Sequence, residues 1–185
     1  MAFGATENYF VAKAAGTITI LGIPVDVQAG VFVGKACSLD PLKLVDPQAG
    51  DVLGGNAQEF AGIYVEFGAG LSLSEILFGE SDCFIDIEVT EVNAVYYDGG
   101  PSTQKIGMRQ QVSADLSLLC LLSGSATFTM FGNLTHSASG YELDIGGSAQ
   151  ICGSIGPCPF CISGCKGITV TGVVNSGGID YHVDY

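Results

Sequence analysis

The densest group of reactive side chains in this sequence is a cluster of cysteines near its C-terminal end. Cys152, Cys158, Cys161 and Cys165 fall within fourteen residues, with the spacing C-x5-C-x2-C-x3-C. Thiols so close together can form disulfides, bind a metal ion as thiolates or act as a redox pair. Each alternative implies a different class of protein.

The spacing and the neighbours of this cluster favour disulfides. Cysteine zinc sites usually combine two C-x2-C pairs, and only Cys158 and Cys161 have that spacing here. A redox C-x-x-C pair needs a helix that starts at its first thiol, and the sequence Ile162-Ser-Gly-Cys-Lys-Gly167 is a poor helix former. We therefore expect a disulfide staple and no metal or cofactor, and we leave the pairing of the four thiols open.

The segments around the cluster indicate where the staple lies. Residues 148–155 and 167–174 look like the two strands of a hairpin, with residues 156–166 as their connection. Cys152 and Cys165 then flank the base of the loop, and Cys158 and Cys161 lie at its tip. Three further cysteines bring the total to seven; these are Cys37, Cys83 and Cys120. Because seven is an odd number, at least one thiol is expected to be free or to pair with another chain.

Other residues capable of chemistry are scattered. His136 and His182 fall on the polar side of predicted strands, far from any nucleophile motif, so we interpret them as surface histidines and expect no enzyme activity. The sequence also contains an acidic row, which consists of Asp82, Asp86, Glu88 and Glu91. Such a row is typical of a solvated strand face, and the alternative interpretation is a calcium site.

The pattern that must position these residues has a period of two. Apolar and polar residues alternate over 83–89, 125–130, 141–145 and 179–185, as in half-buried strands, and Gly-rich turns separate them. Residues 116–122 are apolar on both sides and predict a central strand. About a dozen such runs predict an all-β fold, either an antiparallel sandwich or a wrapped β-meander with little helix.

Breaks in the pattern suggest three regions. Residues 1–37 form an N-terminal arm with a β-hairpin, residues 38–59 an irregular linker, and residues 60–185 the main antiparallel domain. Within the linker, Asp40 is a candidate helix cap with Pro41 in the first turn, and residues 74–77 are a second candidate helical turn.

Composition excludes some partners. The chain has 185 residues, 48% of them hydrophobic, so it can bury a core. Its 19 acidic and six basic residues give a net charge of −13, which disfavours nucleic acid and anionic membranes. No apolar run is long enough to span a membrane, and the chain as given contains no signal peptide. The cysteines nevertheless favour an oxidising, extracellular or cell-surface location.

Several C-terminal motifs together resemble the terminal β module of very large bacterial surface or scaffold proteins. They are Ser117-Leu-Leu-Cys120, the stretch from Gly124 to Gly132, Cys158-Pro-Phe-Cys161 and the closing His182-Val-Asp-Tyr185. The resemblance covers roughly residues 60–185, and Cys152 and Cys165 depart from its pattern. It implies a non-enzymatic structural role.

From these observations we expect a disulfide-stabilised structural or assembly module of an extracellular fibre, layer or large surface protein. Its partner is expected to be a second copy or another protein, joined by addition of the N-terminal arm to a sheet edge. The alternatives are a β module that binds carbohydrate or an apolar ligand, and a thiolate metal protein.

Overall fold

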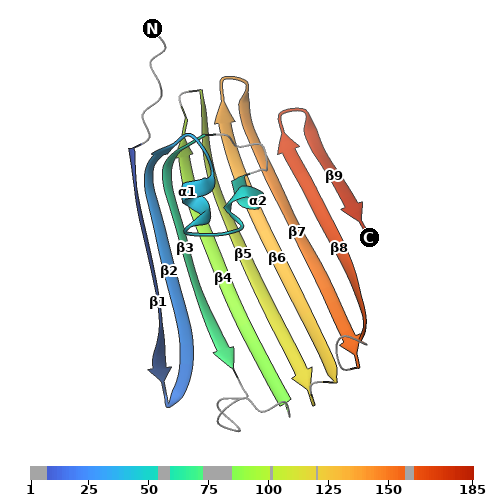
Figure 1. The fold of residues 1–185 in the computed structure, drawn as a ribbon. Coiled ribbons are helices and arrows are strands. Elements are labelled where there is room, and N and C mark those ends of the chain that lie inside the picture. The colour runs from blue at the N-terminus through green and yellow to red at the C-terminus, as the bar shows by residue number, and fades with distance from the viewer. Residues whose placement is uncertain (1–7, 54–58, 73–84, 101, 120, 157–160) are drawn as a thin grey trace.

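Figure 1 shows a computed structural model of the chain, which describes residues 8–53, 59–72, 85–100, 102–119, 121–156 and 161–185. These residues form a single antiparallel sheet of nine strands in sequence order, each hydrogen-bonded to the next. The strands are β1 (Asn8–Ile20), β2 (Ile23–Ala36), β3 (Phe60–Ser72), β4 (Ile85–Gly99), β5 (Thr103–Leu118), β6 (Leu122–Ser137), β7 (Gly140–Ile155), β8 (Ile162–Asn175) and β9 (Gly178–Asp184). Two short helices, α1 (Asp40–Lys43) and α2 (Ala49–Leu53), lie in front of the sheet in Figure 1.

The expected all-β, antiparallel fold with little helix is confirmed. Of the two predicted architectures, the sheet is a meander, and it stays one open layer without a second sheet packed against it among the described residues. Alternation of apolar and polar residues fixes the strands, but it does not determine whether successive strands share one sheet or divide between two.

The hairpin expected as a separate N-terminal arm belongs to the same sheet. β2 pairs with β3 from Asp26–Gly70 to Ala36–Phe60. The stretch expected as an irregular linker contains both helices. Asp40 is not the cap of α1, because it is the first helical residue and Leu39 occupies the cap position; the candidate turn at 74–77 lies outside the described residues.

The prediction of a central strand over residues 116–122 is wrong. β5 ends at Leu118 and β6 begins at Leu122, and the Leu121 amide donates to the Leu118 carbonyl across a distance of 3.0 Å. Leu119 has a φ of 52°, a left-handed conformation that favours glycine. Because a leucine occupies this position, the sequence carries no turn signal here. The apolar run is a hairpin turn with apolar strand ends on either side.

Among the described residues, the hydrophobic core lies where the helices cover the sheet. Leu42, Val45, Val52 and Leu53 from the helical segment pack over aromatic side chains of β2, β3 and β4. These are Phe32, Phe60, Tyr64 and Tyr96. Their ring centroids lie 5.5 Å apart for Phe32 and Phe60, 6.4 Å for Phe60 and Tyr96, and 6.2 Å for Tyr64 and Tyr96. Gly30 makes room for this layer, because a Cβ at that position would meet Val45 Cγ1 at 2.6 Å.

In the other half of the sheet, the described residues form no core of their own. Among the described residues after Arg109, none is buried, although they include β6, β7, β8 and β9. A sheet normally needs a second layer on at least one face to be stable in water. Half of this molecule therefore lacks the layer that the helices supply to the rest.

Candidate functional site

The two faces of the sheet differ in chemical character. Because side chains alternate along a strand and the register pairs opposite residues directly, each face can be assigned residue by residue. One face contacts α1 and α2 and carries most of the Ser, Thr, Asp and Glu residues; it is called the helix-bearing face below. The other, here the apolar face, consists of the even-numbered residues of β1, β5, β6 and β8 and the odd-numbered residues of β2, β3, β4, β7 and β9.

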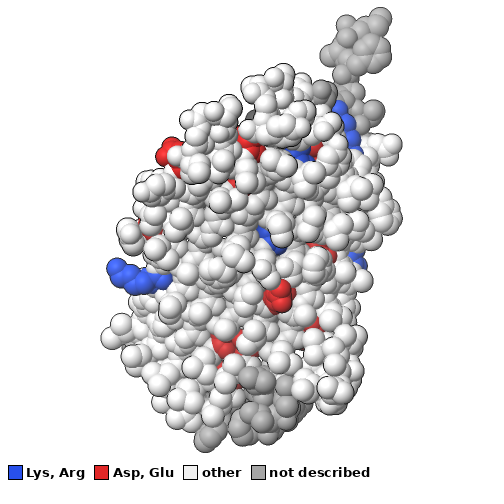
Figure 2. Space-filling view, turned by 180° about the vertical axis from the view of Figure 1, so that it is seen from behind, with Lys and Arg blue, Asp and Glu red and all other residues white. Residues whose placement is uncertain are grey.

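None of the elements that the structure describes covers the apolar face. Large hydrophobic side chains from every strand lie exposed on it, for example Phe10, Phe67, Met108, Ile151 and Tyr181. Figure 2 shows this side of the molecule, where charged residues are few. Soluble monomers rarely expose contiguous apolar patches above a few hundred Å². This face is therefore the leading candidate for a functional surface.

The accessible surface of the whole chain measures the same effect. It is 11889 Å², whereas a compact 19.0 kDa monomer exposes roughly 8,400 Å². The excess is therefore about 3,500 Å² by the same scaling. An open single layer explains this excess, since both of its faces contact solvent over much of their area.

A small polar cluster interrupts the apolar face near its centre. Glu91 Oε1 accepts hydrogen bonds from Gln110 Nε2 at 2.8 Å and from Asn93 Nδ2 at 3.2 Å. Both bonds lower the pKa of Glu91, and the bond from Gln110 has the larger effect, so the carboxylate is charged at neutral pH. Two other charged residues belong to this face, Lys35 on β2 and Lys166 on β8.

The helix-bearing face holds a buried ion pair beneath the helices. Arg109 Nη2 lies 2.8 Å from Asp46 Oδ2, and both side chains are almost fully buried. The Tyr64 hydroxyl donates a hydrogen bond of 2.5 Å to the same carboxylate oxygen, and Arg109 also donates to the Gln48 side chain. Burial, and then the contact with Asp46, raises the pKa of Tyr64. The cluster attaches the helical segment to β3 and β5.

Glu66 forms a second buried contact beside this cluster. Its Oε1 accepts a 2.7 Å hydrogen bond from Gln28, and Lys13 Nζ lies 3.6 Å from its Oε2. Burial raises the pKa of Glu66, against the opposing effect of Lys13. Lys13 also donates to the carbonyl of Val45, so it holds the helical segment to β1. Both clusters therefore attach the covering layer to the sheet.

A shallow hollow of about 280 Å³ lies further along the helix-bearing face. Its lining includes the carboxylates of Asp86, Glu88 and Asp115 together with serine hydroxyls and the Cys152–Cys165 pair. The acidic row expected from the sequence is thus divided: Asp86 and Glu88 share this face, whereas Glu91 points to the other one because strand residues alternate. Asp82 lies outside the described residues.

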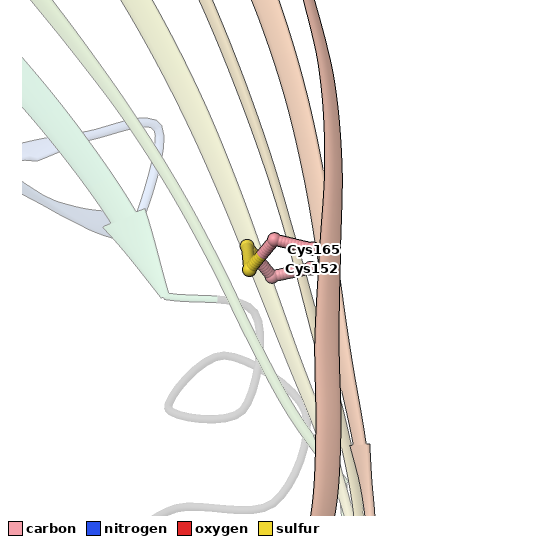
Figure 3. Close-up of a disulfide and its surroundings, with 2 residues drawn as sticks. All are labelled: Cys152 and Cys165. Atoms are coloured by element: carbon pink, nitrogen blue, oxygen red, sulfur yellow. A yellow bond between two sulfur atoms is a disulfide. The ribbon is translucent and has the colours of Figure 1, made fainter.

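The cysteine cluster contains the expected staple. Cys152 and Cys165 are directly opposite in β7 and β8 and form a disulfide, with both side chains on the helix-bearing face (Figure 3). Cys161 is also disulfide-bonded. Cys158, Cys83 and Cys120 lie outside the described residues. The pairing that the sequence left open is thereby resolved for the base of the loop.

The two histidines lie far from each other. His182 contacts Asp184 at 2.9 Å on the exposed edge strand β9. His136 packs on Tyr141 and belongs to the apolar face, so the prediction that it lies on the polar side is wrong. Within the described ranges, no group of three metal-binding side chains comes together. Nor does any helix there have the length and hydrophobicity needed to cross a membrane.

No family model, curated protein or solved structure matches this chain. The candidate site therefore rests on the geometry alone. Sequence reasoning missed both the apolar face as a surface and the Asp46–Arg109 ion pair. The first had a signal, since alternating strands need cover and the chain has few residues outside strands; the second had none, because its partners are 63 residues apart.

Proposed function

We propose that the protein is a non-catalytic structural module that works by assembling with other chains. The observation that carries this proposal is the uncovered apolar face, which extends over all nine strands. A surface of this size and character is typical of a permanent protein–protein interface. The same role is the expectation that the C-terminal motifs of residues 60–185 gave in the sequence.

The edges of the sheet offer a second route of assembly. β1 is an outer strand of 13 residues without proline, and Lys13 is its one charged residue. At the other side, β9 pairs with Thr169–Asn175 and leaves the outer edge of Ile162–Ile168 open among the described strands. Long edges of this kind accept an added strand through main-chain hydrogen bonds. Addition of the N-terminal hairpin edge to a neighbour is thus part of the proposal.

The disulfides support the proposal of an oxidising, extracellular location. Cys152–Cys165 and the bond of Cys161 persist where thiols are not kept reduced. The net charge of −13 disfavours a nucleic-acid partner on electrostatic grounds. We therefore place the module in a fibre, layer or large surface protein outside the cell.

Light scattering coupled to size exclusion, followed by electron microscopy across a concentration series, tests the assembly function. Self-association is the expected result. Ala15→Lys places a charge on the outer strand β1, and Ser148→Lys is the matched change on the interior strand β7 of the same face. Loss of higher assemblies in Ala15→Lys alone supports edge addition. A particle that stays monomeric and binds no other protein refutes the function.

A ligand-binding module is the second candidate. The hollow beside Cys152 and Cys165 favours it, since carboxylates and serine hydroxyls are suitable partners for the hydroxyl groups of a carbohydrate. Calorimetric titration with a panel of oligosaccharides tests it. Asp115→Asn is expected to weaken any binding at this place, whereas Asp180→Asn on β9, away from the hollow, is not.

A further inference from the structure

The partner of the apolar face must present an equally large surface. Nine strands about 4.8 Å apart, most of them 13 to 16 residues long with about 3.3 Å per residue, give a face of roughly 2,000 Å². Two such faces packed together bury an area in the range of obligate homodimers, about 2,000–5,000 Å² in total. A second copy therefore supplies a surface of the required size.

The position of the missing core limits where this partner lies. The helices supply a core to β2, β3 and β4, and no described residue after Arg109 is buried. The half formed by β6, β7, β8 and β9 depends most on an added layer. A partner centred near β6 covers that half and extends back to β3.

Two residues of opposite charge on the apolar face lie at similar positions along the strand direction, which is called the height of a residue below. The register places Glu91 on β4 in line with Ile168 on β8, through Val112, Phe128 and Ala149. Lys166 lies two residues from Ile168 on the same face, which is about 7 Å along the strand. Glu91 and Lys166 are thus at nearly the same height, two strands to either side of β6.

We propose that a second copy of this chain covers the apolar face, related to the first by a two-fold axis that runs roughly along β6. This operation exchanges β4 with β8, so Glu91 of each copy lies opposite Lys166 of the other. The interface is isologous: the same patch packs on itself, and both ion pairs form at once. The inference rests on the proposed function and names the partner for its main surface.

Other partners fit the face less well. A hydrocarbon surface would cover the charged Glu91 and the amides of Asn93 and Gln110 without offering a counter-charge, which is costly. A positively charged partner leaves Lys166 unpaired, and a negatively charged one leaves Glu91 unpaired. The face itself carries both signs, so a second copy satisfies both residues.

Zero-length carbodiimide cross-linking of the intact protein tests the arrangement directly. The reagent joins a carboxylate to an amine only when they are in contact. Within one copy, Glu91 and Lys166 are four strand spacings apart, roughly 19 Å, so a link between them forms only between copies. We expect a covalent dimer in which peptide mass spectrometry finds the Glu91–Lys166 link. A dimer without this link overturns the proposed arrangement.

Charge reversal tests the same contact in solution. Glu91→Lys and Lys166→Glu are each expected to weaken dimerisation by at least about tenfold in sedimentation equilibrium, and the double reversal is expected to restore it. Lys105→Glu on the helix-bearing face is the matched control and leaves the dimer unchanged. All these side chains are partly or fully exposed, so circular dichroism should confirm unchanged folding.

The remaining outcomes separate this proposal from the function on which it rests. If Ala15→Lys dissociates the assembly and the reversals do not, the copies join by their edges, and only the face-to-face pairing is overturned. If the protein is monomeric and floats with phosphatidylcholine vesicles, lipid covers the face and the pairing is again overturned. A monomer that binds neither copies, proteins nor vesicles removes the assembly function as well.

Discussion

Replacing Arg109 by methionine is expected to destabilise the fold through an unpaired buried charge. Met fills much of the volume of Arg but leaves Asp46, which is 2% exposed, without its cationic partner at 2.8 Å. Breaking a buried ion pair in this way costs about 3–5 kcal/mol. Asp46 keeps its hydrogen bonds from the Tyr64 hydroxyl and the Gln48 amide, so we expect the lower end, about 3 kcal/mol. For a chain of this size that is a fall in Tm of about 6–12 °C.

Thermal unfolding followed by far-UV circular dichroism measures this effect. Lys105→Met is the matched control, because Lys105 is a cation on the same strand and the same face that is not buried. The double variant Arg109→Met with Asp46→Leu removes both charges and is expected to recover part of the loss. Equal falls in Tm for Arg109→Met and Lys105→Met would refute the role given to the buried pair.

Three further changes test other parts of the structure. Cys152→Ser with Cys165→Ser opens a loop with a sequence separation of 13, so the free energy of unfolding is expected to fall by up to about 3 kcal/mol in urea titrations. Glu66 has a raised pKa because it is buried, so the folded state holds the proton more tightly and stability falls as pH rises above 4.5; Glu66→Gln should flatten this dependence in Tm measured from pH 4 to 8. Gly107→Ala places a Cβ 2.3 Å from a ring carbon of Tyr96 and should lower Tm, whereas Gly124→Ala, 3.7 Å from the nearest heavy atom, should change it far less.

The strands were predictable because their signal is local. Alternation over 125–130, 141–145 and 179–185 identified parts of β6, β7 and β9, and the glycines at 177 and 178 marked the turn between β8 and β9. Leu119 shows where such reasoning fails, since a hairpin turn with a leucine at positive φ carries no turn residue. The division into arm, linker and domain rested on the same local breaks. Such breaks do not reveal that β2 pairs with β3 along its length.

The candidate site was predictable only in part. Neighbouring strands bring Cys152 and Cys165 together, so their spacing around a loop was enough to suggest a staple. Asp46 and Arg109 come from a helical segment and a strand that meet only in the folded chain. Whether the apolar face is covered depends on the whole sheet. The same alternation of residues fits a strand in an open layer and a strand packed in a sandwich, so no single strand predicts it.

The disulfide between β7 and β8 has a structural consequence that follows from its position. It lies in the half of the sheet without a core, and the pairs that follow it toward the end of the two strands are Gly153–Gly164 and Ser154–Ser163. Side chains this small specify the pairing of two strands only weakly, and a slip of one residue would turn each apolar side chain of β8 to the opposite face. A covalent bond between opposite residues prevents that slip. The cysteines thus preserve the apolar face itself, including the height of Lys166 relative to Glu91, on which the proposed assembly of two copies depends.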